Sequence, residues 1–180
     1  MEEHSIDDIR HFVGNGVRKL IERSVPAGTS ASELSQVFAD FRAYYMQHSQ
    51  DSTRPYDGIC EMLQELKKQG CKMAVVSNKM MAATQELCQY FFPDTIEVAI
   101  GENEAEGIRK KPAPDTVFAA LRQLGVGENE AVYVGDSDVD LETARQSGLP
   151  CISVLWGFRD RDFLIKHGAK TFVSAPKELL

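Results

Sequence analysis

The stretch "AVYVGDSDVDLETARQSG", residues 131–148, decides the fold of this chain. It begins with a short apolar run, which is typical of a buried strand, and ends with the spacing of an amphipathic helix. The carboxylates of Asp136, Asp138 and Asp140 lie between the two. In a parallel α/β sheet, ligands bind at the carboxyl ends of the strands. We therefore predict a doubly wound α/β fold with a functional site at this junction.

The chain after residue 53 repeats this alternation of short apolar runs and amphipathic helices. We predict strands at 71–78, 96–101, 131–136 and 151–157, and helices at 80–92, 113–125 and 140–148. Strands separated by helices favour right-handed crossovers and a mostly parallel sheet with helices on both faces. This pattern is typical of a Rossmann-like, doubly wound domain.

The first 52 residues have a different, purely helical pattern. Apolar residues recur at helical spacing in three segments, 5–13, 17–25 and 30–49, and the first two are separated by Gly-Asn-Gly. Polar residues and Pro55 then interrupt the helical pattern. We predict two domains, a small helical unit at 1–52 and an α/β core at 53–180.

The composition excludes several classes of protein. The net charge of −7 argues against a general nucleic-acid binder, since such proteins need a basic face. The four cysteines form no C-x-x-C pair, which favours a reduced cytosolic protein over a disulfide framework or a zinc site. No apolar run has membrane-spanning length, and the N-terminus has no apolar signal region. We expect a cytoplasmic protein without nucleic-acid or membrane partners.

Three groups of polar residues follow or lie between the predicted strands. Ser77 and Asn78 come after the apolar run of one strand, Lys111 precedes a proline, and Asp136 and Asp140 come after the apolar run of another strand. Each group alone has an ordinary explanation: a helix cap, a solvated lysine, or acidic residues at the positive end of a helix. Together they suit a phosphate group whose charge is balanced by lysine and by a hard cation such as Mg2+.

The order of these groups resembles that of a known family. A strand ending in Ser, then Lys-Pro, then a strand ending in Gly-Asp-Ser-x-x-Asp, is similar to the second, third and fourth motifs of the haloacid dehalogenase superfamily of phosphatases. The resemblance extends from about residue 56 to the end. "RHFVGNGVRKLIERSV" at 10–25 is similar to the helical cap domain of phosphoglycolate phosphatases, and "LWGFRD" at 155–160 also fits that subgroup.

The resemblance implies roles for individual residues of the core. Ser77, with the Asn78 N–H beside it, would donate hydrogen bonds to the transferring phosphoryl group. Lys111 would neutralise that group and orient the nucleophile. Asp136 would bind Mg2+, and Asp140 would hold the metal directly or through a water.

The resemblance also implies substrate contacts from the cap at Gly14, Asn15, Gly16 and Arg18. An arginine there would suit a carboxylate-bearing substrate such as 2-phosphoglycolate. A solvated helix position is the alternative for Arg18. The substrate expected on these grounds is a small phosphorylated metabolite.

One motif of the superfamily is absent from these residues. Relatives carry Asp-x-Asp-Gly-Thr at the end of the first core strand, with the nucleophile as its first aspartate, and no stretch here matches it. About thirty residues, including that strand and the start of the cap, are expected to be missing. The strand would lie between those ending at Ser77 and Gly135, so we expect two unpaired strand edges there. A homodimer that fills this slot is one hypothesis.

Three functions remain open from the sequence. The first is a phosphoglycolate phosphatase-like enzyme whose start is misplaced, so that the nucleophile lies upstream; the 180-residue chain alone would then be weak or inactive. The second is a catalytically silent relative that binds a phosphorylated ligand, Mg2+ or a protein partner. The third is a different doubly wound domain, such as a signalling receiver with Asp136 as phosphoacceptor.

Overall fold

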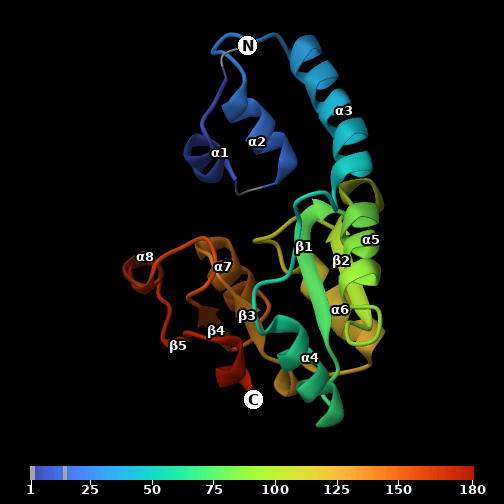
Figure 1. Cartoon of the computed structure of the whole chain (residues 1–180), viewed down its shortest axis with the longest axis vertical. Coiled ribbons are helices and arrows are strands. Elements are labelled where there is room, and N and C mark those ends of the chain that lie inside the picture. The colour runs from blue at the N-terminus through green and yellow to red at the C-terminus, as the bar shows by residue number, and fades with distance from the viewer. Residues whose placement is uncertain (1–2, 14–15) are drawn as a thin grey trace. The chain divides into compact units, whose positions relative to one another are not determined.

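The computed structural model describes residues 3–13 and 16–180. The chain divides into two compact units, Met1–Thr53 and Arg54–Leu180. Figure 1 shows the helices of the first unit in blue and the second unit from green to red. Each unit is described by itself below.

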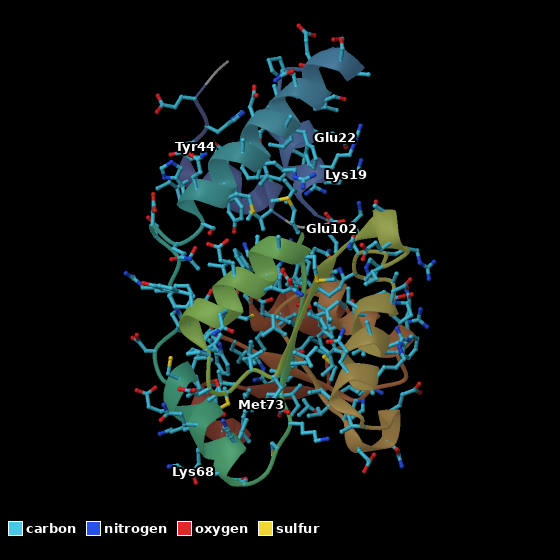
Figure 2. The ribbon with its side chains drawn as sticks, turned by 90° about the vertical axis from the view of Figure 1, so that its right-hand side faces the viewer. Lys19, Glu22, Tyr44, Lys68, Met73 and Glu102 are labelled. Atoms are coloured by element: carbon cyan, nitrogen blue, oxygen red, sulfur yellow. The ribbon has the colours of Figure 1, made fainter. Side chains whose placement is uncertain are left out.

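The first unit consists of three helices, α1 (Ile6–Phe12), α2 (Val17–Ser24) and α3 (Ala31–His48). The side chains of Ser5 and Ser30 cap the first and third helices, and each cap is closed by an acidic residue three positions later. These helices confirm the helical pattern predicted from the sequence. Figure 2 shows Lys19 and Glu22 together on α2, where their charged groups are 2.6 Å apart.

The second unit alternates strands and helices in the predicted order. Its elements are α4 (Ile59–Lys68), β1 (Ala74–Met80), α5 (Met81–Phe91), β2 (Val98–Glu102), α6 (Asp115–Leu124), β3 (Tyr133–Gly135), α7 (Asp138–Gln146), β4 (Cys151–Val154), α8 (Arg161–Lys166) and β5 (Thr171–Val173). Short 3-10 helices, η1 (Glu104–Glu106), η2 (Glu128–Glu130) and η3 (Pro176–Leu179), complete the unit. The structure adds α4, α8 and β5 to the elements predicted from the sequence.

The strands form two parallel sheets instead of one continuous sheet. β1 pairs with β2, and β3, β4 and β5 pair in that order. Figure 1 shows the two groups separately, and Figure 2 labels Met73 just before β1 and Glu102 at the end of β2. Among the described residues, no strand pairs with the free edge of β1 or of β3. The two unpaired edges expected on either side of the slot are therefore present.

Helix α6 packs against both sheets and joins them. Its Val117 and Leu121 belong to a buried cluster with Tyr133 of β3, whereas its Ala119 and Ala120 pack with Val98 and Ile100 of β2. Figure 2 shows α5 and α6 on opposite sides of the β1–β2 pair. The arrangement confirms a doubly wound α/β fold, which brings the ends of β1 and β3 to the same edge of the unit.

Of the helices in the described residues, none combines the length and the apolar character needed to cross a bilayer.

Candidate active site

A buried ion pair between Lys111 and Asp140 forms the centre of the site. The Lys111 ammonium is 2.7 Å from Asp140 Oδ1, and the side chains are 13% and 7% exposed, respectively. The Tyr133 hydroxyl accepts from Lys111 Nζ at 3.1 Å and donates to the same Asp140 oxygen at 2.9 Å. These three groups come from the loop before α6, from β3 and from α7. Because all three contact one another, each fixes the position of the other two.

The second carboxylate oxygen of Asp140 is held by the turn that joins β3 to α7. Asp140 Oδ2 accepts from the Ser137 hydroxyl at 2.6 Å and from the Asp136 backbone N–H at 3.2 Å. Ser137 is also the N-cap of α7, since its side chain accepts from the Asp140 N–H. Both oxygens of Asp140 are thus bound by the protein.

Asp136 is held by the loop that follows β4. Its Oδ2 accepts from the backbone N–H of Phe158 at 2.8 Å. A Cβ at Gly157 would overlap the Asp136 carboxylate, so only glycine lets this loop approach so closely. Among the described residues, Asp136 Oδ1 accepts no hydrogen bond. That oxygen is the one free to bind a ligand.

Asn78 fixes the backbone of Lys111 from β1. Its Oδ1 accepts from the Lys111 N–H at 2.6 Å, and its Nδ2 donates to the Lys111 carbonyl at 3.0 Å. The Lys111–Pro112 peptide bond is cis. The Ser77 hydroxyl accepts from the Lys79 N–H at 3.1 Å. Ser77 and Asn78 lie within β1, where the pairing with β2 becomes irregular; the predicted strand at 71–78 ends at Asn78, whereas β1 continues to Met80.

The structure brings together most of the core residues predicted for the site. Asn78, Lys111, Asp136 and Asp140 form one connected network, whereas the Ser77 side chain has no hydrogen bond to that network within the described residues. Their catalytic roles stay predictions.

The predicted cap residues lie in the first unit. Gly14 and Asn15 are outside the described residues. Gly16 is the N-cap of α2 with a φ of 88°. The Arg18 side chain is 59% exposed, and its Nε is 3.4 Å from Glu22 Oε1 one turn along the helix. An exposed arginine on a helix is compatible with both readings of the sequence, so the role of Arg18 stays a prediction.

Sequence reasoning did not assign Tyr133, Ser137 or the Phe158 N–H to the site. Ser137 was visible inside the acidic stretch, between two of its aspartates. Tyr133 looked like an ordinary strand residue, because only the register of β3 shows that its hydroxyl reaches Lys111. A backbone donor such as the Phe158 N–H leaves no signal in side-chain patterns.

The two aspartates have opposite electrostatic environments. Burial raises the pKa of Asp140, but the Lys111 charge and hydrogen bonds from Lys111, Ser137 and Tyr133 outweigh it and lower this pKa to about 2. Burial also raises the pKa of Asp136, and the Phe158 N–H only partly opposes this effect. The charge of Asp140 adds to the increase for Asp136.

These shifts predict a stability change at low pH. The pKa of Asp140 falls from the ordinary 3.8 to about 2 on folding, so its stabilising contribution is complete above about pH 4 and is lost as the pH falls toward 2. The raised pKa of Asp136 has the opposite effect on stability. It lowers the free energy of unfolding as the pH rises above 3.8. In EDTA, the free energy of unfolding should therefore fall more steeply between pH 4 and pH 2 in the wild type than in Asp140→Asn. Equal slopes in urea titrations would contradict this prediction; ion pairs away from the site, such as Arg109–Asp115, contribute equally to both proteins.

The donor chemistry of the site fits a hard cation. In the described part of the chain, no group of three or more His, Cys, Asp or Glu side chains could hold a metal ion. Mg2+, however, is usually bound by one or two carboxylates together with waters and substrate phosphate. Asp136, with its free Oδ1, fits that pattern. The carboxylate of Asp140 accepts a hydrogen bond from the Asp136 backbone N–H.

Comparison with known proteins decides the family. The sequence model of the haloacid dehalogenase-like hydrolases matches residues 1–154. The chain belongs to the haloacid dehalogenase-like hydrolase family. The resemblance seen in the sequence is therefore confirmed.

Curated relatives of this chain include phosphatases. The chain is 32% identical over 159 residues to the phosphoglycolate phosphatase of Aquifex aeolicus, covering 88% of this chain and 72% of the relative. It is 27% identical over 174 residues to the N-acetylmuramic acid 6-phosphate phosphatase of Pseudomonas aeruginosa, covering 96% of this chain and 76% of the relative.

A solved structure agrees with the fold. A protein from Lactobacillus delbrueckii subsp. bulgaricus, assigned as a phosphoglycolate phosphatase, superimposes with a TM-score of 0.89 at 35% identity. The match covers 98% of this chain and 82% of the solved chain. This hydrolase therefore shares nearly its whole described fold with a longer relative.

Proposed function

We propose that this hydrolase binds a small phosphate monoester at the Lys111–Asp136 edge, as part of a Mg2+-dependent phosphatase of the phosphoglycolate phosphatase type. The observation that carries the proposal is the buried Lys111 ammonium, held by Asp140 and Tyr133 beside the free carboxylate oxygen of Asp136. A fixed positive charge and a hard cation together balance the charge of a phosphoryl group. The acidic chain with four free cysteines suits a cytoplasmic enzyme.

Each core residue would have a distinct task. Lys111 neutralises a phosphate oxygen, and Asn78 keeps the Lys111 backbone in place through its two hydrogen bonds. Asp136 Oδ1 would bind Mg2+, with Asp140 holding the neighbouring turn. Ser77 would donate to the phosphate once its hydroxyl turns from the strand. Bound Mg2+ would supply charge neutralisation of the phosphoryl oxygens.

Two features bear on the extent of activity. The 180 residues contain no Asp-x-Asp-Gly-Thr motif, and phosphate monoester hydrolysis needs very large acceleration. We propose that these residues alone hydrolyse phosphate esters weakly or not at all, although they bind phosphate and Mg2+. The names of the relatives favour a phosphoglycolate-like substrate. A silent relative that only binds phosphorylated ligands or a protein partner is the second candidate, favoured by the missing motif.

The test measures turnover and binding in the same preparation. Phosphate release from 2-phosphoglycolate and p-nitrophenyl phosphate is followed with and without Mg2+, and inorganic phosphate binding is measured by calorimetry. We expect little or no turnover, and Mg2+-dependent phosphate binding that falls at least about 10-fold in Asp136→Asn, the loss of one charge-assisted contact. Asp138→Asn is the matched control, because Asp138 lies on the same turn but faces Arg159 at 3.7 Å.

Each result has a definite meaning. Phosphate binding that is lost in Asp136→Asn but kept in Asp138→Asn supports the proposal. Absence of phosphate binding in the wild type, or equal loss in both variants, overturns it. Substantial turnover that disappears in Asp136→Asn would show that another residue replaces the missing nucleophile, and would overturn the proposed inactivity.

A further inference from the structure

The loop between β4 and α8 borders the candidate active site. The Phe158 N–H donates to Asp136 Oδ2 at 2.8 Å, and a Cβ at the preceding Gly157 would overlap the same carboxylate. The next residue, Arg159, has its Nε 3.7 Å from Asp138 Oδ1. The loop is thus attached at two successive residues to the acidic turn that follows β3.

The far end of this loop is also fixed. Asp160 caps α8, since its side chain accepts from the Phe163 N–H at 2.8 Å. The Arg159 guanidinium lies over the Phe163 ring, 4.8 Å from the ring centroid. These contacts, together with those to the acidic turn, determine the backbone path of the loop beside the site.

Phe158 differs from its neighbours in its exposure. It is 61% exposed, whereas residues 155–157 and Arg159 are partly buried. Single exposed apolar side chains are common on protein surfaces and need no explanation by themselves. Phe158 is distinguished by its place, because its own backbone N–H holds the carboxylate proposed to bind Mg2+.

The geometry of a phenylalanine limits how far the ring can lie from the site. Standard bond lengths put the ring centre about 4–5 Å from the backbone nitrogen of the same residue. With the hydrogen bond to Asp136 added, the Phe158 ring lies within about 8 Å of Asp136 Oδ2 in any rotamer. A phosphate oxygen bound through Mg2+ would lie about 4 Å from the Asp136 carboxylate, with the carbon atoms of the ester beyond it. The ring and the alcohol part of such an ester are therefore within reach of each other.

We propose that Phe158 is a substrate-specificity residue, whose exposed ring packs against the alcohol part of the phosphate ester held at Lys111 and Asp136. The inference rests on the proposed function and deepens it by naming the kind of ester. An aromatic ring gains free energy by burying apolar surface, and its face is negatively polarised. Phe158 therefore favours esters whose alcohol contains a ring, such as an aryl or a sugar phosphate. A short carboxylate-bearing group would gain nothing from this contact.

The experiment compares three phosphonates, which phosphatases cannot hydrolyse. Their dissociation constants for the purified 180-residue chain are measured by calorimetry with Mg2+ present. Methylphosphonate offers the charged group alone, benzylphosphonate adds an aromatic ring, and 3-phosphonopropionate adds a carboxylate as in 2-phosphoglycolate. We expect the wild type to bind benzylphosphonate at least about 5-fold more tightly than methylphosphonate, the usual gain from one aromatic contact.

Variants of Phe158 separate the ring from the backbone N–H. Phe158→Ala keeps the N–H that holds Asp136 but removes the ring. Its affinity for benzylphosphonate should fall at least about 5-fold, whereas those for methylphosphonate and 3-phosphonopropionate should change less than about 2-fold. Phe158→Tyr keeps a ring and should retain the preference for benzylphosphonate.

Tyr90 provides the matched control for loss of an exposed ring. It is 62% exposed and lies near the C-terminal end of α5, whereas the N-terminal end of that helix follows β1 at the site. Tyr90→Ala should leave all three affinities unchanged.

Each result decides for or against the inference. A preference for benzylphosphonate that disappears in Phe158→Ala and remains in Phe158→Tyr supports it. No preference in the wild type, or the same preference in Phe158→Ala, overturns this inference alone, since binding of methylphosphonate leaves the proposed function standing. An equal loss of all three phosphonates in Phe158→Ala would limit Phe158 to holding Asp136 and would also overturn it. If the wild type binds none of them, the proposed function fails and this inference fails with it.

Discussion

Replacing Lys111 with methionine is expected to lower the free energy of unfolding by about 3–5 kcal/mol, the usual cost of breaking a buried ion pair from one side. Methionine keeps most of the side-chain volume but leaves the Asp140 carboxylate, 7% exposed, without its cation. Asp140 would retain only its bonds from Tyr133, Ser137 and the Asp136 N–H. Urea denaturation at pH 7 in EDTA measures the change.

The neighbouring lysine provides the matched control. Lys110 Nζ is 3.9 Å from Glu104 Oε1, and their side chains are 35% and 57% exposed. Lys110→Met should therefore change stability by less than about 1 kcal/mol. Lys111→Met combined with Asp140→Asn should cost less than the sum of the two single changes, because each removes the same interaction. A Lys111→Met protein within about 1 kcal/mol of the wild type would refute the buried ion pair as a stabilising element.

The sequence predicted those parts of the site that consist of charged side chains at or near the ends of strands and helices. Lys111, Asp136 and Asp140 stand at recognisable positions, and the fold brings them together. Tyr133 was not predictable in the same way, because its role depends on which face of β3 it occupies. The backbone N–H of Phe158 depends on a loop path that no pattern of side chains encodes.

The elements that were missed are short or lie beside clearer signals. β5 has three residues and α8 has six, so neither shows a complete period of its pattern. Helix α4 follows the polar segment that separates the two units, and its apolar face gives a weaker signal than the strand pattern that comes after it. The break in the sheet was predictable only through the family resemblance, since local sequence does not reveal which strands are neighbours.

Gly135→Ala is expected to disrupt the same site through its packing. A Cβ at Gly135, the last residue of β3, would overlap the side chain of Asp140. The strand and the first turn of α7 must then separate, at a cost of about 1–3 kcal/mol. Because Asp140 would move, Lys111 should lose part of its ion pair.

This coupling distinguishes displacement of Asp140 from general strain. Lys111→Met should cost clearly less in the Gly135→Ala protein than in the wild type, because the ion pair is already weakened. Gly127→Ala is the matched control: its φ is −85°, and the added Cβ would approach only the Asn129 and Glu130 side-chain ends, which can move. It should leave both stability and the effect of Lys111→Met nearly unchanged. If Lys111→Met costs the same in all three backgrounds, Gly135 does not position Asp140, and the close approach of β3 to α7 has no part in the site.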